Sequence, residues 1–182
     1  MTKSVKQIII INFIIFAITY LFSLYGLYLN NILALYPIGS DFFRPYQLLT
    51  HLFAHHNIEH VFYNMLILFI LGQEVEDRLG SRKFWSFYLL SGFFSSGFYC
   101  LGVSGGIIGA SGAVFATLSA SIFINFRKKD IRYILRNLFL STLIILEFYS
   151  AFFAIDNIGH WAHIFGAVFG IGYFFFKRNT NS

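Results

Sequence analysis

Long apolar segments joined by short polar connections constrain this chain more than any other feature. In chain order the segments are 8–29, 58–71, 84–101, 111–126, 134–153 and 160–176. Hydrophobic residues make up 57% of the chain and charged residues only 12%, and a soluble domain of 182 residues cannot bury so much apolar surface. The sequence therefore predicts an integral, all-α membrane protein.

The segment lengths predict a single domain, 1–182, with six transmembrane helices. A bilayer core of ~30 Å requires ~20 helical residues, so the second, fourth and sixth segments are short. Lys3 and Lys6 before the first segment resemble the start of a signal peptide, but no small-residue cleavage site follows. We therefore interpret 8–29 as an uncleaved first span. The lone Cys100 excludes an internal disulfide.

Positive charge orients these helices. Of the 13 Lys and Arg residues, all but Arg44 fall at the N-terminus, at 78–83, at 127–136 or at the C-terminus. With six spans these four places lie on one side, so the positive-inside rule predicts that both termini are cytoplasmic. The net charge of +5 then reflects topology and indicates no nucleic-acid partner.

A serine and two histidines lie near the starts of three apolar segments. Ser111 follows Ile-Ile-Gly-Ala, while His60 and His163 begin the second and sixth segments. Counting back from the charged ends places Ser111 at ~24 Å and both histidines at ~21 Å, at a rise of ~1.5 Å per residue. Polar groups are costly at this depth, so a nucleophile and a base at one level predict a functional site.

Small residues recur beside both reactive candidates. Gly112, Ala116 and Ala120 are spaced four apart in one segment, as are Gly166 and Gly170 in the other. Such stripes let membrane helices approach closely, either for packing alone or to bring a serine and a histidine into contact.

The stretch 102–109 has too many glycines for a stable helix. Irregular backbone at membrane depth is tolerated only where it lines a wet cavity or is buried in protein. We expect a water-filled depression, open to the outer face, next to the serine.

Several histidines precede and enter the second segment. His51, His55 and His56 are expected to tie the preceding loop to the helix, whereas His60 and Asn64 lie deeper and can face Ser111. Metal binding is the alternative for such a cluster, but the chain lacks an HExxH motif and a cysteine partner. We therefore expect no metal and no other cofactor.

In combination and order, these motifs resemble the rhomboid family of intramembrane serine proteases. The resemblance spans about residues 42–172, within an expected core of 42–176, and its elements follow in chain order: Phe-Arg-Pro-Tyr-Gln at 43–47, His60-x-x-x-Asn64, the turn 72–80, Gly109-Ala-Ser111-Gly112, and Ala-His163-x-x-Gly166-x-x-x-Gly170.

The resemblance implies roles for these residues in a six-helix bundle. Ser111 is the expected nucleophile and His163 its base, without an acid. His60, Asn64 and the Ser111 N–H are expected to stabilise the oxyanion. Gly109, Gly112, Phe115 and Gly166 are expected to shape the site, with Phe115 at a position that the family often fills with tyrosine.

Three further titratable residues are candidates for a place near the site. His160 lies one turn from His163, but the motif and the depth estimate favour His163 as the base. Asp156 is the only carboxylate expected near the site. Glu147 has no assigned role: it can lie at a cavity edge, pair with a histidine or sit near the outer interface.

The resemblance implies a peptide hydrolase acting on single-span membrane proteins in the bilayer, with its site open to the outer or periplasmic face. The composition suits a bacterial plasma membrane. Two alternatives remain: a catalytically silent relative that binds transmembrane clients, and a small transporter or proton channel. Retention of Ser111 and His163 argues against the first, and the Gly-x-Ser-Gly loop is unexplained by the second.

Overall fold

The computed structural model describes residues 1–102, 106–154 and 159–179, without the side chains of 98–102, 178 and 179. Within these ranges the chain is helical apart from loops and one isolated β-bridge. The helices are α1 (Lys3–Ser23), α2 (Leu29–Leu33), α3 (Gln47–Thr50), the 3₁₀ turn η1 (His51–Phe53), α4 (Ile58–Leu79), α5 (Ser81–Gly102), α6 (Ser111–Asn125), α7 (Ile131–Phe153) and α8 (His160–Asn179).

Six of these helices correspond to the predicted apolar segments, with different ends. The prediction 8–29 was wrong at both ends, because α1 begins at Lys3 and the chain turns at Gly26, whose φ of 77° favours glycine. The second segment is not short: α4 has 22 residues, because the charged stretch 74–78 continues the helix. The sixth segment likewise extends to 20 residues in α8, whereas α6, with 15, is short as predicted.

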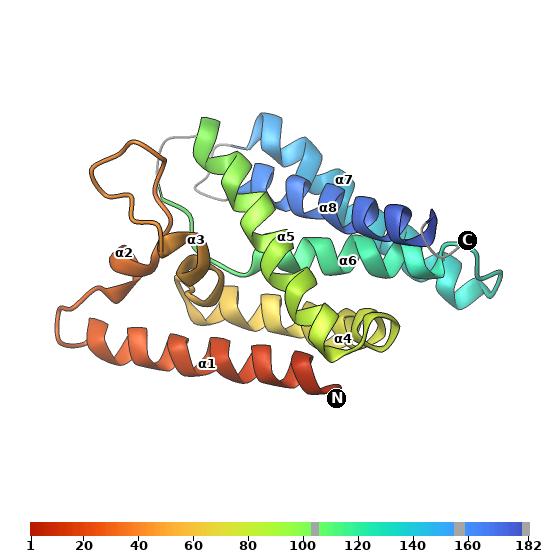
Figure 1. Ribbon diagram of the computed structural model, residues 1–182, viewed down its shortest axis with the longest axis horizontal. Coiled ribbons are helices and arrows are strands. Elements are labelled where there is room, and N and C mark those ends of the chain that lie inside the picture. The colour runs from red at the N-terminus through yellow and green to blue at the C-terminus, as the bar shows by residue number, and fades with distance from the viewer. Residues whose placement is uncertain (103–105, 155–158, 180–182) are drawn as a thin grey trace.

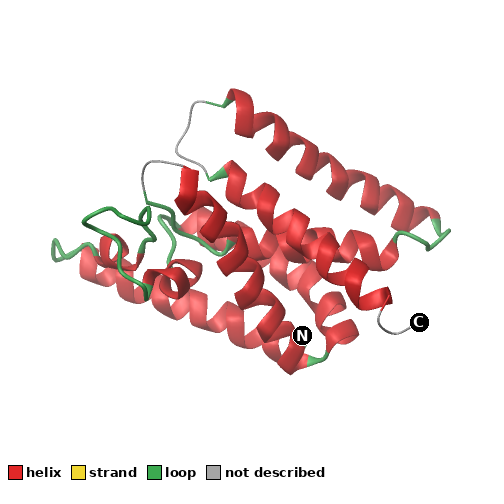
Figure 2. Cartoon of the chain, turned by 45° about the horizontal axis from the view of Figure 1, so that its top comes forward, coloured by secondary structure: helices red, strands yellow, loops and turns green. Residues whose placement is uncertain are grey.

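Helix α6 lies at the centre of the bundle. It contacts α4, α5, α7 and α8, while α1 packs on α4 and α5 (Figures 1 and 2). Its small and apolar residues allow this position, since ten of its fifteen residues are buried. In contrast, Leu140 is the one buried residue within 131–153, so α7 lies at the edge of the bundle.

Glu76 fixes the start of α1 against the end of α4. Its carboxylate accepts hydrogen bonds from the N–H groups of Ser4 and Val5, both at 2.8 Å, and from the hydroxyls of Thr2 and Ser81. The first N–H groups of a helix have no partner within it, and a carboxylate there is favoured by the helix dipole.

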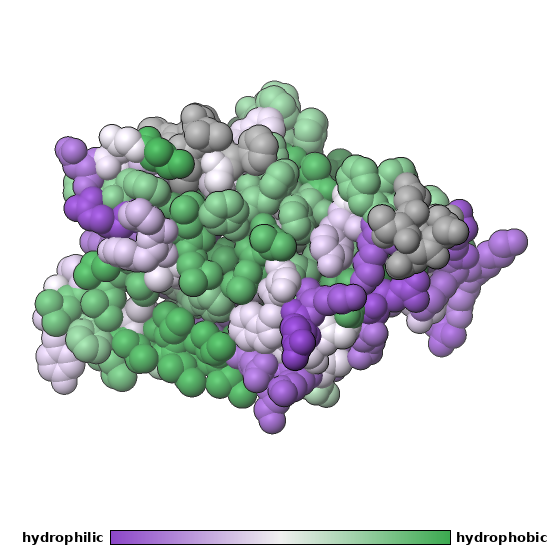
Figure 3. Space-filling model, viewed as in Figure 1, coloured by the Kyte–Doolittle hydropathy of each residue, from purple (hydrophilic) through white to green (hydrophobic). Residues whose placement is uncertain are grey.

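The surface is apolar between two hydrophilic ends. Figure 3 shows hydrophobic residues across the middle of one face, with hydrophilic residues around the chain termini and at the opposite end. Three described helices are long and apolar enough to cross a membrane: Lys3–Ser23, Ile58–Leu79 and Ile131–Phe153. The six-span topology stays a prediction.

The segment between α2 and α4 supports the stretch of chain that leads into α6. Leu35 and Ile107 exchange backbone hydrogen bonds of 2.9 and 2.8 Å, and Gly109 N–H donates to the carbonyl of His51 at 2.8 Å. Buried Gln47, in the predicted Phe-Arg-Pro-Tyr-Gln motif, accepts from Arg44 N–H and donates to the carbonyl of Phe42. Of the predicted irregular stretch, residue 102 ends α5, 103–105 lie outside the described residues, and 106–109 are irregular.

Candidate functional site

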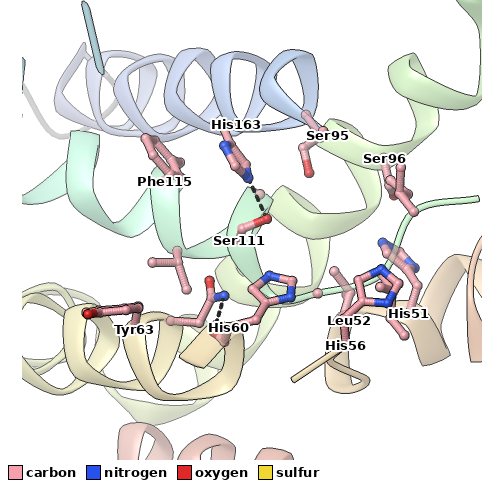
Figure 4. A pocket seen from close by; sticks show the side chains of 18 of the residues that line it. His51, Leu52, His56, His60, Tyr63, Ser95, Ser96, Ser111, Phe115 and His163 are labelled. Carbon is pink, nitrogen blue, oxygen red and sulfur yellow. Dashed lines mark hydrogen bonds between the residues drawn. The ribbon is translucent and has the colours of Figure 1, made fainter. Parts of the chain in front are cut away.

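Ser111 and His163 meet where α6 and α8 begin. His163 Nε2 lies 2.7 Å from Ser111 Oγ, in hydrogen-bonding distance (Figure 4). Ser111 is the first residue of α6, so its N–H has no acceptor within the helix. It follows Gly109, whose φ of 127° is strained for other residues. Ser111 thus lies at the start of a helix and lines the cavity, with its hydroxyl on His163.

The stripes of small residues explain why α6 and α8 come so close. A Cβ on Gly166 would collide with the backbone oxygen of Gly112, and one on Gly170 would collide with that of Ala116. Next to Gly170, the Ser119 hydroxyl donates to the carbonyl of Ala167 at 2.8 Å. The stripes therefore serve packing and the site at once, since the close packing of α6 and α8 is what brings Ser111 and His163 into contact.

Phe115 lies flat against the His163 ring. Their centroids are 4.6 Å apart and their planes differ by 4°. Phe115 is one turn after Ser111, so the serine and the ring that contacts its histidine come from the same helix. A phenyl ring thus provides the stacking surface without a hydroxyl.

We expect Phe115→Leu to lower kcat/KM for any reaction at Ser111 by about 3- to 10-fold, because an aromatic contact contributes about 0.5–1.5 kcal/mol. Helix α6 should stay folded, since leucine suits a helix well. Phe126→Leu is the matched control, because Phe126 is 78% exposed at the end of the same helix. Equal rates for Phe115→Leu and wild type would show that stacking does not orient His163.

A carboxylate contacts the other side of His163. Glu147 Oε2, from α7, lies 2.8 Å from His163 Nδ1 and 2.6 Å from His160 Nδ1. The expectation that Asp156 is the only carboxylate near the site was therefore wrong, and Asp156 itself lies outside the described residues. Two of the alternatives given for Glu147 are confirmed together, since it lines the cavity and pairs with histidines. The signal in the sequence is that Glu147 is the single acidic residue between positions 131 and 153.

His60 and Asn64 lie across the cavity from His163. The His60 ring faces Gly109, where a Cβ would collide with it, and Figure 4 shows His60 on the opposite side of Ser111 from His163. Asn64 Nδ2 donates to the carbonyl of His60 at 2.8 Å, within α4. Both side chains line the cavity, but the Asn64 amide is turned toward its own helix.

The remaining histidines precede α4, with His51 in η1 and the other two in the loop after it. His51 Nδ1 donates to the carbonyl of Gln47 at 2.6 Å, and His55 Nε2 lies 3.5 Å from the N–H of Ala110. Burial lowers the pKa of His51 to about 4 and that of His55 to about 3, so both are neutral at pH 7. His56 precedes α4, which has Asn57 as its N-cap, and stacks on His60.

These residues surround a cavity of about 530 Å³. It is lined by the N-terminal ends of α4, α6 and α8, by the segment 106–109 and by Glu147 of α7. A serine hydroxyl hydrogen-bonded to a histidine inside a cavity can carry out acyl transfer.

Comparison with known proteins identifies the family. The Rhomboid domain matches residues 42–180. The chain is 34% identical over 126 residues to rhomboid protease GluP of Bacillus subtilis, and 27% identical over 135 residues to rhomboid protease GlpG of Serratia proteamaculans. This chain belongs to the rhomboid family. Together with its apolar helices, family membership makes it an integral membrane protein.

The rhomboid match covers the whole site but not α1, which precedes residue 42. The alignments cover 68% of this chain for GluP and 73% for GlpG, but only 25% and 48% of those proteins. Rhomboid-like protein 11 of Arabidopsis thaliana, a chloroplastic protein, is 29% identical in an alignment of length 179 that covers 90% of this rhomboid and 61% of that protein. This rhomboid therefore spans a quarter to three fifths of the length of these relatives.

Proposed function

We propose that this rhomboid is an intramembrane serine endopeptidase that cleaves single-span membrane proteins in or near their transmembrane segments. The observation that carries the proposal is the 2.7 Å contact between Ser111 Oγ and His163 Nε2 inside a cavity. Two relatives are named rhomboid proteases, which supports the same chemistry.

The proposed reaction starts with attack of Ser111 Oγ on the scissile carbonyl. His163 Nε2 accepts the hydroxyl proton and then gives it to the leaving amine. Water next attacks the acyl group on Ser111, while His163 takes a proton from the water and returns it to Ser111 Oγ as the acid product leaves. The Ser111 N–H, which has no acceptor within α6, and the His60 ring on the same cavity are the proposed donors to the oxyanion. The Asn64 amide can donate to the oxyanion as well, once it turns from the His60 carbonyl to the cavity.

The substrate must reach Ser111 as extended chain, because the carbonyls of a helix are already hydrogen-bonded and shielded. A cavity of about 530 Å³ offers room for a short length of extended chain and for water, and small residues around Ser111 favour small side chains beside the cut.

Charge and the position of the cavity support a proposal for the membrane placement. The turn between α4 and α5 and the loop between α6 and α7 carry basic clusters, whereas α4, α6 and α8 begin at the cavity. We therefore propose six spans with cytoplasmic termini and a site that opens to the opposite, periplasmic or outer, face of a bacterial plasma membrane.

The proposal is tested by cleavage of single-span model substrates by purified protein in liposomes. Wild type and Ser86→Ala should cleave equally, because Ser86 is exposed near the start of α5 and does not line the cavity. Ser111→Ala should be inactive, and a chelator should have no effect. Cleavage that survives Ser111→Ala would exclude the serine mechanism, and binding without cleavage by wild type would favour the client-binding alternative.

A further inference from the structure

One oxygen of Glu147 is shared by two imidazole rings. Oε2 contacts Nδ1 of His160 and Nδ1 of His163, and the carboxylate is half-buried, with 23% of the side chain exposed. Each histidine side chain is about 10% exposed. The three groups come from two helices, with Glu147 on α7 and both histidines on the first turn of α8.

These contacts decide which nitrogen of His163 carries the proton. An ionised carboxylate only accepts hydrogen bonds, so Nδ1 of each ring must be the N–H donor toward Oε2. With the proton of neutral His163 on Nδ1, its Nε2 keeps a lone pair directed at the hydroxyl of Ser111. This is the tautomer that a general base requires.

We propose that Glu147 is a positioning residue that holds His163 in its base-competent tautomer and orientation and stabilises the imidazolium formed during turnover. The inference rests on the proposed function for its effect on rate. During attack, the proton moves from Ser111 Oγ to His163 Nε2; the Nδ1 proton stays on the ring and Glu147 stays ionised. His160 contributes a second N–H that keeps Oε2 in place.

The same three side chains could in principle hold a divalent cation. The spacing favours hydrogen bonds instead. Tetrahedral ligands at about 2.0–2.2 Å from a metal stand more than 3 Å apart. Oε2 lies only 2.6 and 2.8 Å from the two nitrogens, the separation of charge-assisted hydrogen bonds.

The position of Glu147 also links His163 to the edge of the bundle. Helix α7 is largely exposed, with Leu140 its one buried residue in 131–153, yet Glu147 reaches from it to the reacting histidine. Phe115 and Glu147 thus contact His163 at its face and at its Nδ1, from two different helices.

The experiment compares Glu147→Gln, Glu147→Asp and Glu147→Leu with wild type in full-length protein. Thr142→Ala is the matched control on α7, because its exposed hydroxyl bonds only within the helix, to the carbonyl of Leu138. Kinetics give kcat and KM for a model substrate. Nitrogen-15 NMR of histidine-labelled protein reports the His163 tautomer without any substrate, with its resonances assigned by their absence from His163→Asn.

We expect Glu147→Gln and Glu147→Leu to lower kcat by about 10²- to 10⁴-fold with KM and thermal stability little changed, and Glu147→Asp to recover part of the loss. The NMR signals of wild type should show a protonated Nδ1 on His163, and this preference should weaken in Glu147→Leu.

Two outcomes would overturn the inference: an unchanged tautomer and kcat in Glu147→Leu, or cleavage that requires added Zn²⁺ through Glu147. If wild type fails to cleave while Glu147→Leu still changes the tautomer, the proposed function fails and the positioning role stands.

Discussion

His163→Ala is expected to lower kcat for peptide-bond hydrolysis by about 10⁴- to 10⁶-fold, the range found when one member of a catalytic serine–histidine pair is removed. The reason is that Nε2 of His163 is the group 2.7 Å from Ser111 Oγ, so no other described base can take the hydroxyl proton at that distance. Substrate cleavage in liposomes, normalised to folded protein, is the measurement.

Ile171→Ala controls for general damage to α8, because Ile171 is 45% exposed on the same helix. His160→Ala tests the competing assignment. Its Nδ1 contacts Glu147, and its loss should reduce the rate far less than loss of His163. If His160→Ala were the inactive variant and His163→Ala the active one, the base would be assigned to the wrong histidine.

Gly166→Ala is expected to reduce both stability and activity strongly. Its Cβ would collide with backbone atoms of Gly112, which cannot turn aside as a flexible side chain can, so α6 and α8 must separate. Overpacking of this kind costs about 1–3 kcal/mol of unfolding free energy. Because Ser111 precedes Gly112 and His163 lies one turn before Gly166, a shift of α8 also stretches the Ser111–His163 contact.

Gly172→Ala is the matched control on the same helix, since a Cβ there meets no atom within 4 Å. That variant should be as stable as wild type or slightly more so, because alanine favours helix by about 1 kcal/mol over glycine. Thermal unfolding in detergent and the cleavage rate measure both effects. Equal behaviour of the two variants would mean that the backbones of α6 and α8 do not pack as closely as described.

The sequence could predict the helices and the contact between Ser111 and His163 because both depend on local sequence patterns. Apolar runs marked the helices, and glycine stripes beside each residue indicated which two must pack together. The ends of helices were less predictable. Charged residues such as Glu74 and Glu76 ended the apolar pattern of 58–71, although the backbone of α4 continues through them to Leu79.

Glu147 shows why the rest of the site could not be predicted. Its position on α7 indicated a polar role, but which ring it contacts depends on how an otherwise exposed helix is rotated against α8. Nothing in the spacing of 147, 160 and 163 fixes that rotation. The orientation of the Asn64 amide could not be predicted either. Its sequence position places the side chain on the cavity, but only the structure shows that the amide donates to the carbonyl of His60.

Labelling with an alkyl fluorophosphonate, which forms a P–O bond to an activated serine and releases fluoride, tests most directly whether His163 activates Ser111. Intact mass and peptide mapping locate the adduct. We expect one adduct, on Ser111, in wild type and in Ser86→Ala, and its loss in His163→Ala. A label elsewhere, or one on Ser111 formed at the same rate without His163, would contradict activation of Ser111 by His163.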